Sequence, residues 1–267
     1  MIQIPIRTKE RLLAGIKKFQ PILVRALDKD INESDTVTIV SDMLSEVFGY
    51  DKYTEITTEY AVKKTYCDLA LKIDGNPRIL IEAKAIGLDL KGDYVRQAVD
   101  YGSNSGIEWI ILTNAKVWRV YKIVFAKPID KELVYEFDFG QINSKKQKDL
   151  ELLYYLCEEG ISKPNTKNLL EEYRVQKELL SRFLIGHILM TEPILDCVRK
   201  MVKKMAPEAR VSNDEILSVI ADEVIKREIF EGDKALEATK RINKLNKPVK
   251  VVPVKVVAKD TKNPDTI

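Results

Sequence analysis

The residue types with the clearest chemical use in this sequence are two carboxylates and a lysine between positions 68 and 84. Asp68 lies in the segment TYCDLALKI, and Glu82 and Lys84 end the segment RILIEAK. Both segments are rich in apolar residues, and the turn sequence DGNP separates them, which predicts two paired strands. Side chains two positions apart on a strand point to the same face, so Glu82 and Lys84 must share one. Asp68 then lies near Glu82 if the register suits.

This trio suits metal-assisted phosphodiester hydrolysis. Two carboxylates can bind Mg²⁺, for which Mn²⁺ can substitute, because these hard cations take oxygen ligands. A neighbouring lysine can orient a water molecule or stabilise the negative charge of the transition state. The sequence has one histidine and no CxxC pair, so oxygen atoms must hold any metal. A second interpretation stays open, in which Lys84 only forms an ion pair with Glu82 or Asp68 at the end of a sheet.

The elements that must position the trio are a β-meander and the helices around it. The patterns predict two early helices, the first capped at Thr8 and the second beginning near Ser34 or Asp35. A later helix carries Gln97 and Tyr101 on one face. Strands are predicted at residues 54–62, 65–73, 78–84, 109–114, 116–124 and 132–139, with a helix at 90–103. We therefore expect an α/β (α+β) fold with a mixed sheet flanked by helices.

The period of the apolar residues becomes helical after Gly140 and stays so. Helical segments are predicted at residues 145–159, 166–190, 191–206 and 212–243. We expect a first domain at residues 1–142, an all-α domain at 143–243, and a tail rich in Lys, Pro and Val at 244–267.

The order of these features resembles a known family. The run from Asp68 through Glu82 to Lys84, the helix with Gln97 and Tyr101 (QxxxY), and the strands WIILTN and KVWRVYKI are similar to the nuclease domain at the N-terminus of type I restriction enzyme R subunits. That domain is a branch of the PD-(D/E)xK nuclease superfamily, and the similarity covers roughly residues 30–125. The resemblance implies a restriction-endonuclease-like mixed sheet and a Mg²⁺-dependent endonuclease that acts on DNA in restriction or defence. It implies Asp68 and Glu82 as metal ligands and catalytic residues, Lys84 as a catalytic residue, and Gln97 and Tyr101 as DNA-positioning residues.

Two departures from the family are informative. Cys67 stands where the superfamily motif has proline before its aspartate, and the sequence contains no GxxxxGK[ST] loop. We therefore expect no ATP site and no ATP-driven translocase. An alternative function is a non-catalytic module on the same fold that binds nucleic acid or a protein. The near-zero charge of the first half favours that alternative, because such a surface binds DNA weakly.

A further acid often joins such sites in this superfamily. The early helix offers Glu33, Asp35, Asp42 and Glu46, among which the sequence does not choose. Asp35 is a possible site residue, but it could equally cap its helix. Glu59 lies in the strand before Asp68. It is either an acid next to the residues of the site or an ordinary surface charge.

Charge and cysteine content restrict the setting of the protein. Totals of 44 basic and 41 acidic side chains give +3; residues 1–142 hold 20 and 21 of them (−1), which leaves 24 and 20 (+4) for residues 143–267. The three cysteines are far apart in apolar surroundings, so we expect buried thiols and a cytoplasmic protein without a membrane span. DNA is the expected partner, and the helical half is a possible surface for a homo-oligomer or another restriction subunit.

Overall fold

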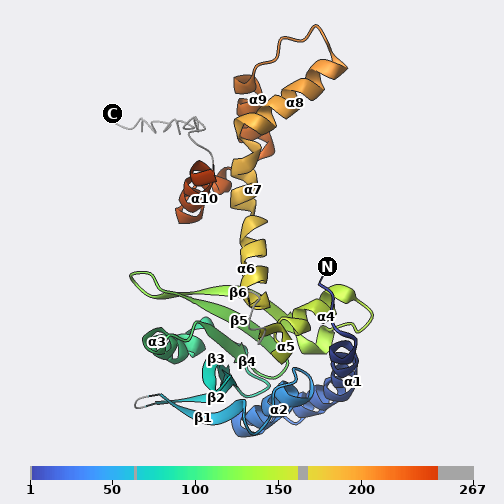
Figure 1. The fold of residues 1–267 in the computed structure, drawn as a ribbon, viewed down its shortest axis with the longest axis vertical. Helices are drawn as coiled ribbons and strands as arrows, with labels where there is room; N and C mark the ends of the chain where they lie inside the picture. The colour runs from blue at the N-terminus through green and yellow to red at the C-terminus, as the bar shows by residue number, and fades with distance from the viewer. Residues whose placement is uncertain (1, 63–64, 162–167, 246–267) are drawn as a thin grey trace, which may run out of the picture. The chain divides into compact units, whose positions relative to one another are not determined.

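The computed structural model describes residues 2–62, 65–161 and 168–245 (Figure 1). The chain forms two compact units, Met1–Arg174 and Val175–Ile267. The first unit contains the sheet, and the second is helical. The division falls inside helix α6 (Leu169–Leu179).

The centre of the first unit is a six-stranded mixed sheet in the order β1-β2-β3-β4-β5-β6. Neighbouring strands are antiparallel except β3 and β4, which are parallel. The crossover between β3 and β4 passes through η1 (Gly92–Val95) and α3 (Arg96–Ser105). The strands are β1 (Ile56–Val62), β2 (Thr65–Ile73), β3 (Asn76–Ala83), β4 (Trp109–Thr113), β5 (Val117–Val124) and β6 (Asp130–Asp138). The predicted α+β class with a mixed sheet is therefore confirmed.

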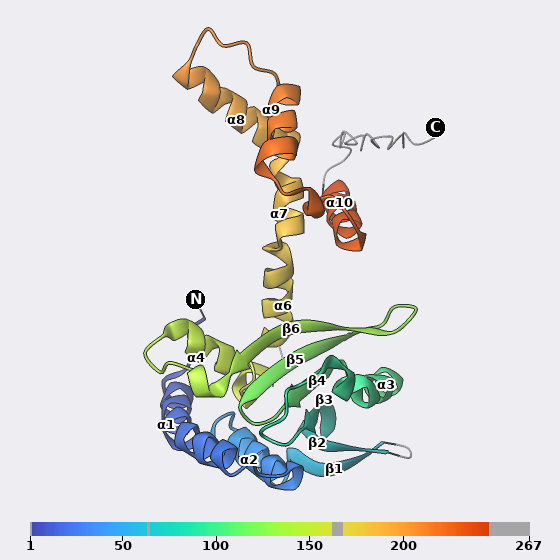
Figure 2. The ribbon, with the colours of Figure 1, turned by 180° about the vertical axis from the view of Figure 1, so that it is seen from behind.

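Helices cover both faces of the sheet, as Figure 2 shows from behind. Alternate residues of a strand point to opposite faces, so the central strands are apolar on both. One face packs under α1 (Ile6–Asp28) and α2 (Glu33–Glu46), and the other packs under α3. On β3, for example, Ile79 and Ile81 belong to the first core cluster, and Leu80 belongs to the second.

The starts of the two early helices differ from the prediction. Pro5 precedes α1, and Thr8 lies inside the helix, where its hydroxyl donates a 2.9 Å hydrogen bond to Glu159 Oε1. Asn32 caps α2, because its Oδ1 accepts a 2.9 Å hydrogen bond from the N–H of Asp35. Asp35 is therefore a first-turn residue and not the cap, and α2 begins at Glu33.

The first unit continues past residue 142 because the next helices complete its core. After the short η2 (Phe139–Gln141), α4 (Gln147–Tyr154) and α5 (Glu158–Ile161) pack with α1 into the first cluster. Arg11 of α1 donates to both carboxylate oxygens of Glu159, at 2.8 and 2.7 Å, and also to the carbonyl oxygens of Val47 and Phe48. The observed unit therefore extends to Arg174, beyond the boundary expected near residue 143.

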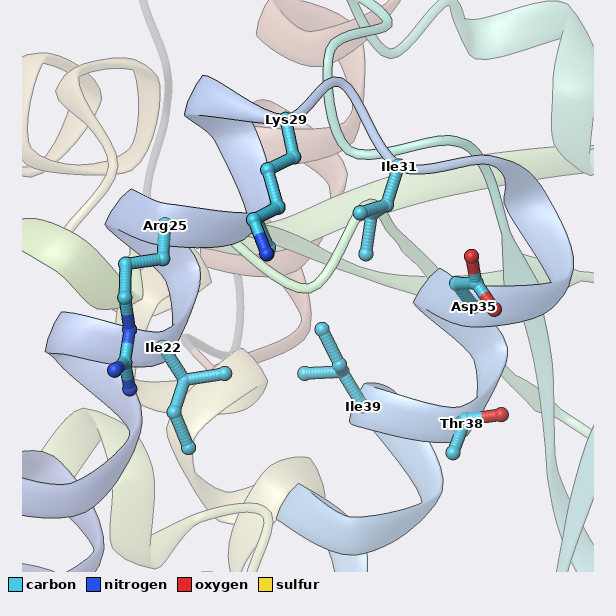
Figure 3. A pocket seen from close by; sticks show the side chains of 8 residues that line it. Ile22, Arg25, Lys29, Ile31, Asp35, Thr38 and Ile39 are labelled. Carbon is cyan, nitrogen blue, oxygen red and sulfur yellow. The ribbon is translucent and has the colours of Figure 1, made fainter.

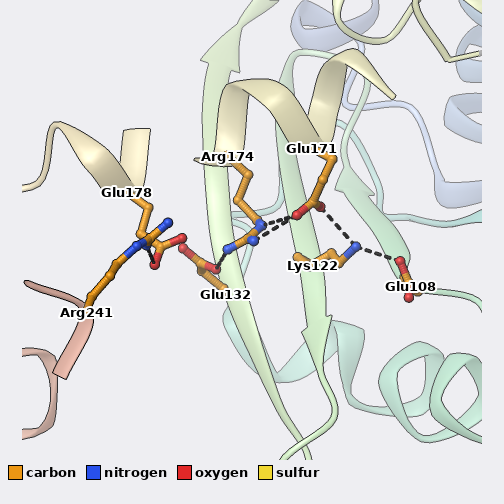
Figure 4. Close-up of polar contacts among 7 residues, drawn as sticks. All are labelled: Glu108, Lys122, Glu132, Glu171, Arg174, Glu178 and Arg241. Carbon is orange, nitrogen blue, oxygen red and sulfur yellow. Dashed lines mark hydrogen bonds and ion pairs between the residues drawn. The ribbon is translucent and has the colours of Figure 1, made fainter. Parts of the chain in front are cut away.

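Ion pairs join the first turns of α6 to the sheet, as Figure 4 shows. Lys122 Nζ of β5 lies 3.1 Å from Glu171 Oε2 and 2.6 Å from Glu108 Oε2. Arg174 binds Glu171 at 2.8 Å and Glu132 of β6 at 3.4 Å. These contacts explain why residues up to Arg174 belong to the first unit. Within the second unit, Arg241 pairs with Glu178.

The second unit is built from short helices with a small apolar core. Leu184, Ala238 and Ile242 form that core, where α7 packs on α10. Cys67 and Cys157 are buried as expected, but Cys197 on α8 is exposed because this core does not reach it. The elements are α7 (Arg182–Leu189), α8 (Glu192–Met205), α9 (Asn213–Val219), η3 (Ile220–Val224), η4 (Arg227–Ile229) and α10 (Asp233–Leu245).

Two remaining expectations concern the tail and the membrane. From residue 246 onward, the predicted tail lies outside the described residues. Across residues 2–62, 65–161 and 168–245, no helix has the length and apolar character that a membrane span requires.

Candidate active site

The trio singled out in the sequence comes together where β3 ends. In the β2–β3 ladder Leu69 pairs with Ile81, so Asp68 and Glu82 occupy the next position on each strand. Asp68 Oδ2 accepts a 2.7 Å hydrogen bond from the N–H of Ala83. This bond ties the aspartate to the backbone between Glu82 and Lys84.

Lys84 is held by its backbone and by its ammonium group. Its N–H donates a 2.8 Å hydrogen bond to the carbonyl oxygen of Thr113, which continues the parallel ladder between β3 and β4. Its Nζ lies 2.8 Å from Glu82 Oε1 and 3.3 Å from Glu33 Oε1. The side chains of Lys84 and Glu82 are only 15% and 14% exposed, whereas Glu33 is 46% exposed. Glu82 and Lys84 therefore form a largely desolvated pair with Glu33 at the rim.

The electrostatics of the cluster favour an additional positive charge. Burial raises the pKa of the Asp68 carboxyl, although the hydrogen bond from Ala83 and the charge of Lys84 oppose this rise. Burial also raises the pKa of Glu82, against the hydrogen bond from Lys84. When ionised, Asp68, Glu82 and Glu33 carry three negative charges against one ammonium. A cation at this point would offset the repulsion and the cost of burial.

Lys84 stays protonated in this surrounding. Burial alone would lower the pKa of its ammonium group, but the pairs with Glu82 and Glu33 and the charge of Asp68 outweigh burial. The pKa of Lys84 is therefore raised above the ordinary lysine value. This group can donate hydrogen bonds to negative oxygen atoms, but it is not suited to accept a proton.

Among the candidate early-helix acids, the structure brings Glu33 to the trio. Asp42 pairs with Lys52 at 2.6 Å, and Glu46 pairs with Lys18. No local signal in the sequence singles out Glu33, because the cap Asn32 fixes where α2 begins but not which strand end lies beside its first turn.

The two predicted candidates for an extra acid, Asp35 and Glu59, lie elsewhere. Asp35 is exposed and lines a hollow of about 390 Å³ between α1 and α2, with Arg25, Lys29 and Thr38 (Figure 3). Glu59 is exposed on β1 and has a positive φ of 48°. Neither is brought into contact with Lys84, whose carboxylate partners are Glu82 and Glu33.

Helix α3 carries the expected QxxxY pair. Its buried residues Ala98 and Val99 pack in the second core cluster together with Val95 of η1. Tyr101 is half-buried, and its ring centroid lies 6.0 Å from that of Tyr60 on β1. The side chain of Gln97 lies outside the described part of the chain.

Comparison with known proteins confirms the resemblance over the middle of the first unit. Residues 38–134 match the family of the type I restriction enzyme R protein N terminus. No curated protein and no solved structure matches the chain at a significant level. The matched segment of this chain contains Asp68, Glu82 and Lys84. Glu33 lies before it. The match shows no helicase part.

The donor set of Asp68 and Glu82 fits a Mg²⁺ ion better than a transition metal. Among the described residues, no group of three or more His, Cys, Asp or Glu is arranged to hold a metal by itself. Mg²⁺ does not need such a group, because it usually keeps several waters and binds one or two carboxylates together with substrate phosphates. Asp68 and Glu82 supply that number of carboxylates.

Cys67, the departure from the superfamily motif, has a packing role here. Its buried Sγ donates to the carbonyl oxygen of Ile81 at 3.1 Å. Burial raises the pKa of this thiol to about 12, so it stays neutral beside Asp68.

Proposed function

We propose that this protein is a metal-dependent endonuclease that hydrolyses phosphodiester bonds of DNA. The observation that carries the proposal is the largely buried Glu82–Lys84 pair, with Asp68 beside it, in a segment that matches restriction R proteins. A structural ion pair needs only one carboxylate. The surplus of buried negative charge around one ammonium is the arrangement expected where a divalent cation and a phosphate bind.

The roles of the residues follow from their geometry. Asp68 and Glu82 would hold Mg²⁺, or Mn²⁺ in its place. The bound metal would polarise the scissile phosphate and lower the pKa of water. The hydrogen bond from Ala83 fixes one oxygen of Asp68 and so sets the orientation of the other. Lys84 stabilises the negative charge that develops on the phosphoryl oxygens, because its ammonium is protonated and held in a site with little water.

We also propose that α8 contacts the DNA backbone. Leu195 is buried, and Val198 and Val202 are half-buried on one side of this helix. Successive residues turn by about 100° around a helix, which places Lys200, Lys203 and Lys204 together on the opposite, exposed side. Lysine side chains in such a row can neutralise phosphates irrespective of base sequence.

The test of the function is nicking of supercoiled plasmid by the full-length protein with Mg²⁺, with Mn²⁺, and with EDTA. We expect nicking with either metal and none with EDTA. The Lys52→Ala variant is the matched control for Lys84→Ala, because Lys52 also pairs with a carboxylate, that of Asp42, but is exposed. If wild type binds DNA but cleaves no plasmid, linear, branched or single-stranded DNA with either metal, the binding-module alternative replaces the nuclease.

A further inference from the structure

Asn114 directly follows β4 and makes three hydrogen bonds with its side-chain amide. Its Nδ2 donates to the carbonyl oxygens of Ile86 at 3.2 Å and Leu88 at 3.0 Å. Its Oδ1 accepts a 2.8 Å bond from the N–H of Val117. Asn114 is only 6% exposed and its bond to Ile86 is fully buried, so removal of the amide would leave at least that carbonyl oxygen without a partner or water. The sequence placed Asn114 at the end of the predicted strand 109–114.

The loop that Asn114 holds is the one that leaves Lys84. The backbone of Lys84 is bound to Thr113, the residue before Asn114, and Ile86 is buried two positions later. The Nδ2 bonds therefore secure the chain just after the point where β3 ends. Arg119 secures the far end of the same loop through the carbonyl oxygen of Leu90.

The linker between α1 and α2 lies beside the same loop. A Cβ added to Gly87 would lie 2.5 Å from Oδ1 at the end of the exposed Asp30 side chain, which places Gly87 next to this linker. Asp30 lies three positions before Glu33, the second partner of Lys84. The loop therefore lies between Asn114, which binds it, and the segment that carries Glu33.

An asparagine suits this position for a specific reason. The site presents two carbonyl oxygens on one side and one N–H on the other, which matches the NH₂ and C=O groups of a single amide. Aspartate would place oxygen against two carbonyl oxygens, and alanine would leave all three groups unpaired.

We propose that Asn114 is a positioning residue of the active site, which fixes the loop behind Lys84 and thereby the placement of the Lys84 ammonium between Glu82 and Glu33. This role rests on the proposed nuclease function but is testable without it. Misplacement of a reacting group by about 1 Å can lower a rate 100-fold. A loosened loop should therefore reduce turnover more than DNA affinity.

The experiment compares full-length wild type with Asn114→Ala and with Arg119→Met, which removes the bond to the Leu90 carbonyl oxygen at the far end of the same loop. Two readouts need no activity: the NMR signal of the Lys84 side chain at one fixed pH, assigned by its loss in Lys84→Arg, and hydrogen exchange of the backbone amides of residues 86–90. The third readout is the separation of kcat and KM in plasmid nicking. Tyr50→Phe is the matched control. It removes a buried 2.9 Å hydrogen bond to the carbonyl oxygen of Leu156 and so lowers stability away from the loop.

We expect Asn114→Ala and Arg119→Met to shift the Lys84 signal, to speed exchange in the loop, and to lower kcat with KM nearly unchanged, about 10- to 100-fold for Asn114→Ala. Tyr50→Phe should lower the melting temperature and leave these readouts as in wild type. The proposal is overturned if Asn114→Ala only melts earlier, like Tyr50→Phe, with the Lys84 signal and kcat unchanged. If Asn114→Ala does not fold, Arg119→Met decides by the same criteria. If wild type does not cleave DNA, the nuclease proposal fails, and the NMR and exchange readouts alone decide the positioning role.

Discussion

Glu33 Oε1 at the start of α2 lies 3.3 Å from the Nζ of Lys84 at the end of β3, across 51 positions of the chain. The contact joins a helix on one face of the sheet to the strand end that carries the candidate trio. Because Glu33 is half-exposed and Glu82 is not, the ammonium has one solvated and one buried partner.

Removal of the Glu33 charge should reduce activity without destabilising the fold. We expect Glu33→Gln to lower plasmid nicking several-fold, because the ammonium loses one of the two groups that orient it. The melting temperature should change little, since exposed ion pairs contribute about 0–1 kcal/mol. Asp35→Asn, two positions along the same helix turn, is the control and should nick as wild type does. If Glu33→Gln nicks plasmid as fast as Asp35→Asn and wild type do, Glu33 has no role in activity.

Loss of the Lys84 ammonium should affect catalysis far more than DNA binding. We expect Lys84→Ala to lower nicking about 100- to 1,000-fold, the loss typical of one group that stabilises transition-state charge. DNA affinity, measured by fluorescence anisotropy, should stay near that of wild type. Stability should fall by about 1–3 kcal/mol, because Glu82 is left without its partner in a poorly solvated site. A variant that only melts earlier, with its nicking rate preserved below its melting temperature, would show that the pair is structural.

The pH dependence of stability should reveal the cost of burying Asp68. Since burial raises the pKa of this carboxyl, the folded protein keeps the proton to a higher pH than the unfolded chain does. Stability therefore falls as the pH rises from the ordinary aspartate pKa through the raised value. In EDTA, we expect Asp68→Asn to melt above wild type near neutral pH and to lose this advantage near pH 4 or below, about the unperturbed pKa.

The matched control for Asp68 has the opposite sign. Hydrogen bonds from Thr54 and Tyr53 lower the pKa of Asp51, so its ionised form stabilises the fold above the ordinary aspartate pKa. Asp51→Asn should therefore melt below wild type at neutral pH. Asp68→Asn should also lose nicking activity. If both variants shift the melting temperature in the same direction, burial of Asp68 is not the cause of its effect.

The bonds of Arg11, which join α1 to Glu159 of α5, should matter for stability only. Arg11→Met removes the bonds to Glu159, Val47 and Phe48, and we expect a loss of about 1.5–3 kcal/mol, the range for hydrogen bonds to charged groups. Arg96→Met is the control, because its pair with Asp93 is exposed on both sides and should contribute little. Urea unfolding measures both. An equal effect of the two substitutions would contradict the assignment.

The lysine row of α8 should determine the salt dependence of DNA binding. Each phosphate neutralised adds about 0.9 to the slope of log affinity against log salt concentration. Replacement of Lys200, Lys203 and Lys204 by glutamine should therefore reduce the slope by up to about 3. The control replaces Lys234, Lys240 and Lys244 on α10 by glutamine, which changes the net charge equally. The slope of this variant should stay close to that of wild type. Equal slopes for the two triple variants would count against a specific contact by α8.

Features that depend on local spacing were predictable from the sequence alone. The apolar strands β2 and β3 around a DGNP turn predicted their pairing, and the two-residue spacing predicted a common face for Glu82 and Lys84. Helical spacing likewise predicted a helix that carries Gln97 and Tyr101, and α3 contains both. Such patterns are repeated every two or 3.6 residues, so they are readable without knowledge of the fold.

Long-range packing, in contrast, sets which distant segments of the chain meet. Periodicity shows which face of a helix is apolar, but not which strand end lies beside its first turn. For that reason Glu33 could not be chosen over Asp35. The hydrogen bond from Asn114 to Ile86, across 28 positions, could not be predicted either. An asparagine that only ends a strand and one that binds a distant loop have the same local sequence pattern. The first unit extends to Arg174 for the same reason. α4 and α5 pack on α1 through long-range contacts such as Arg11 with Glu159. The spacing of apolar residues along the sequence does not reveal such contacts.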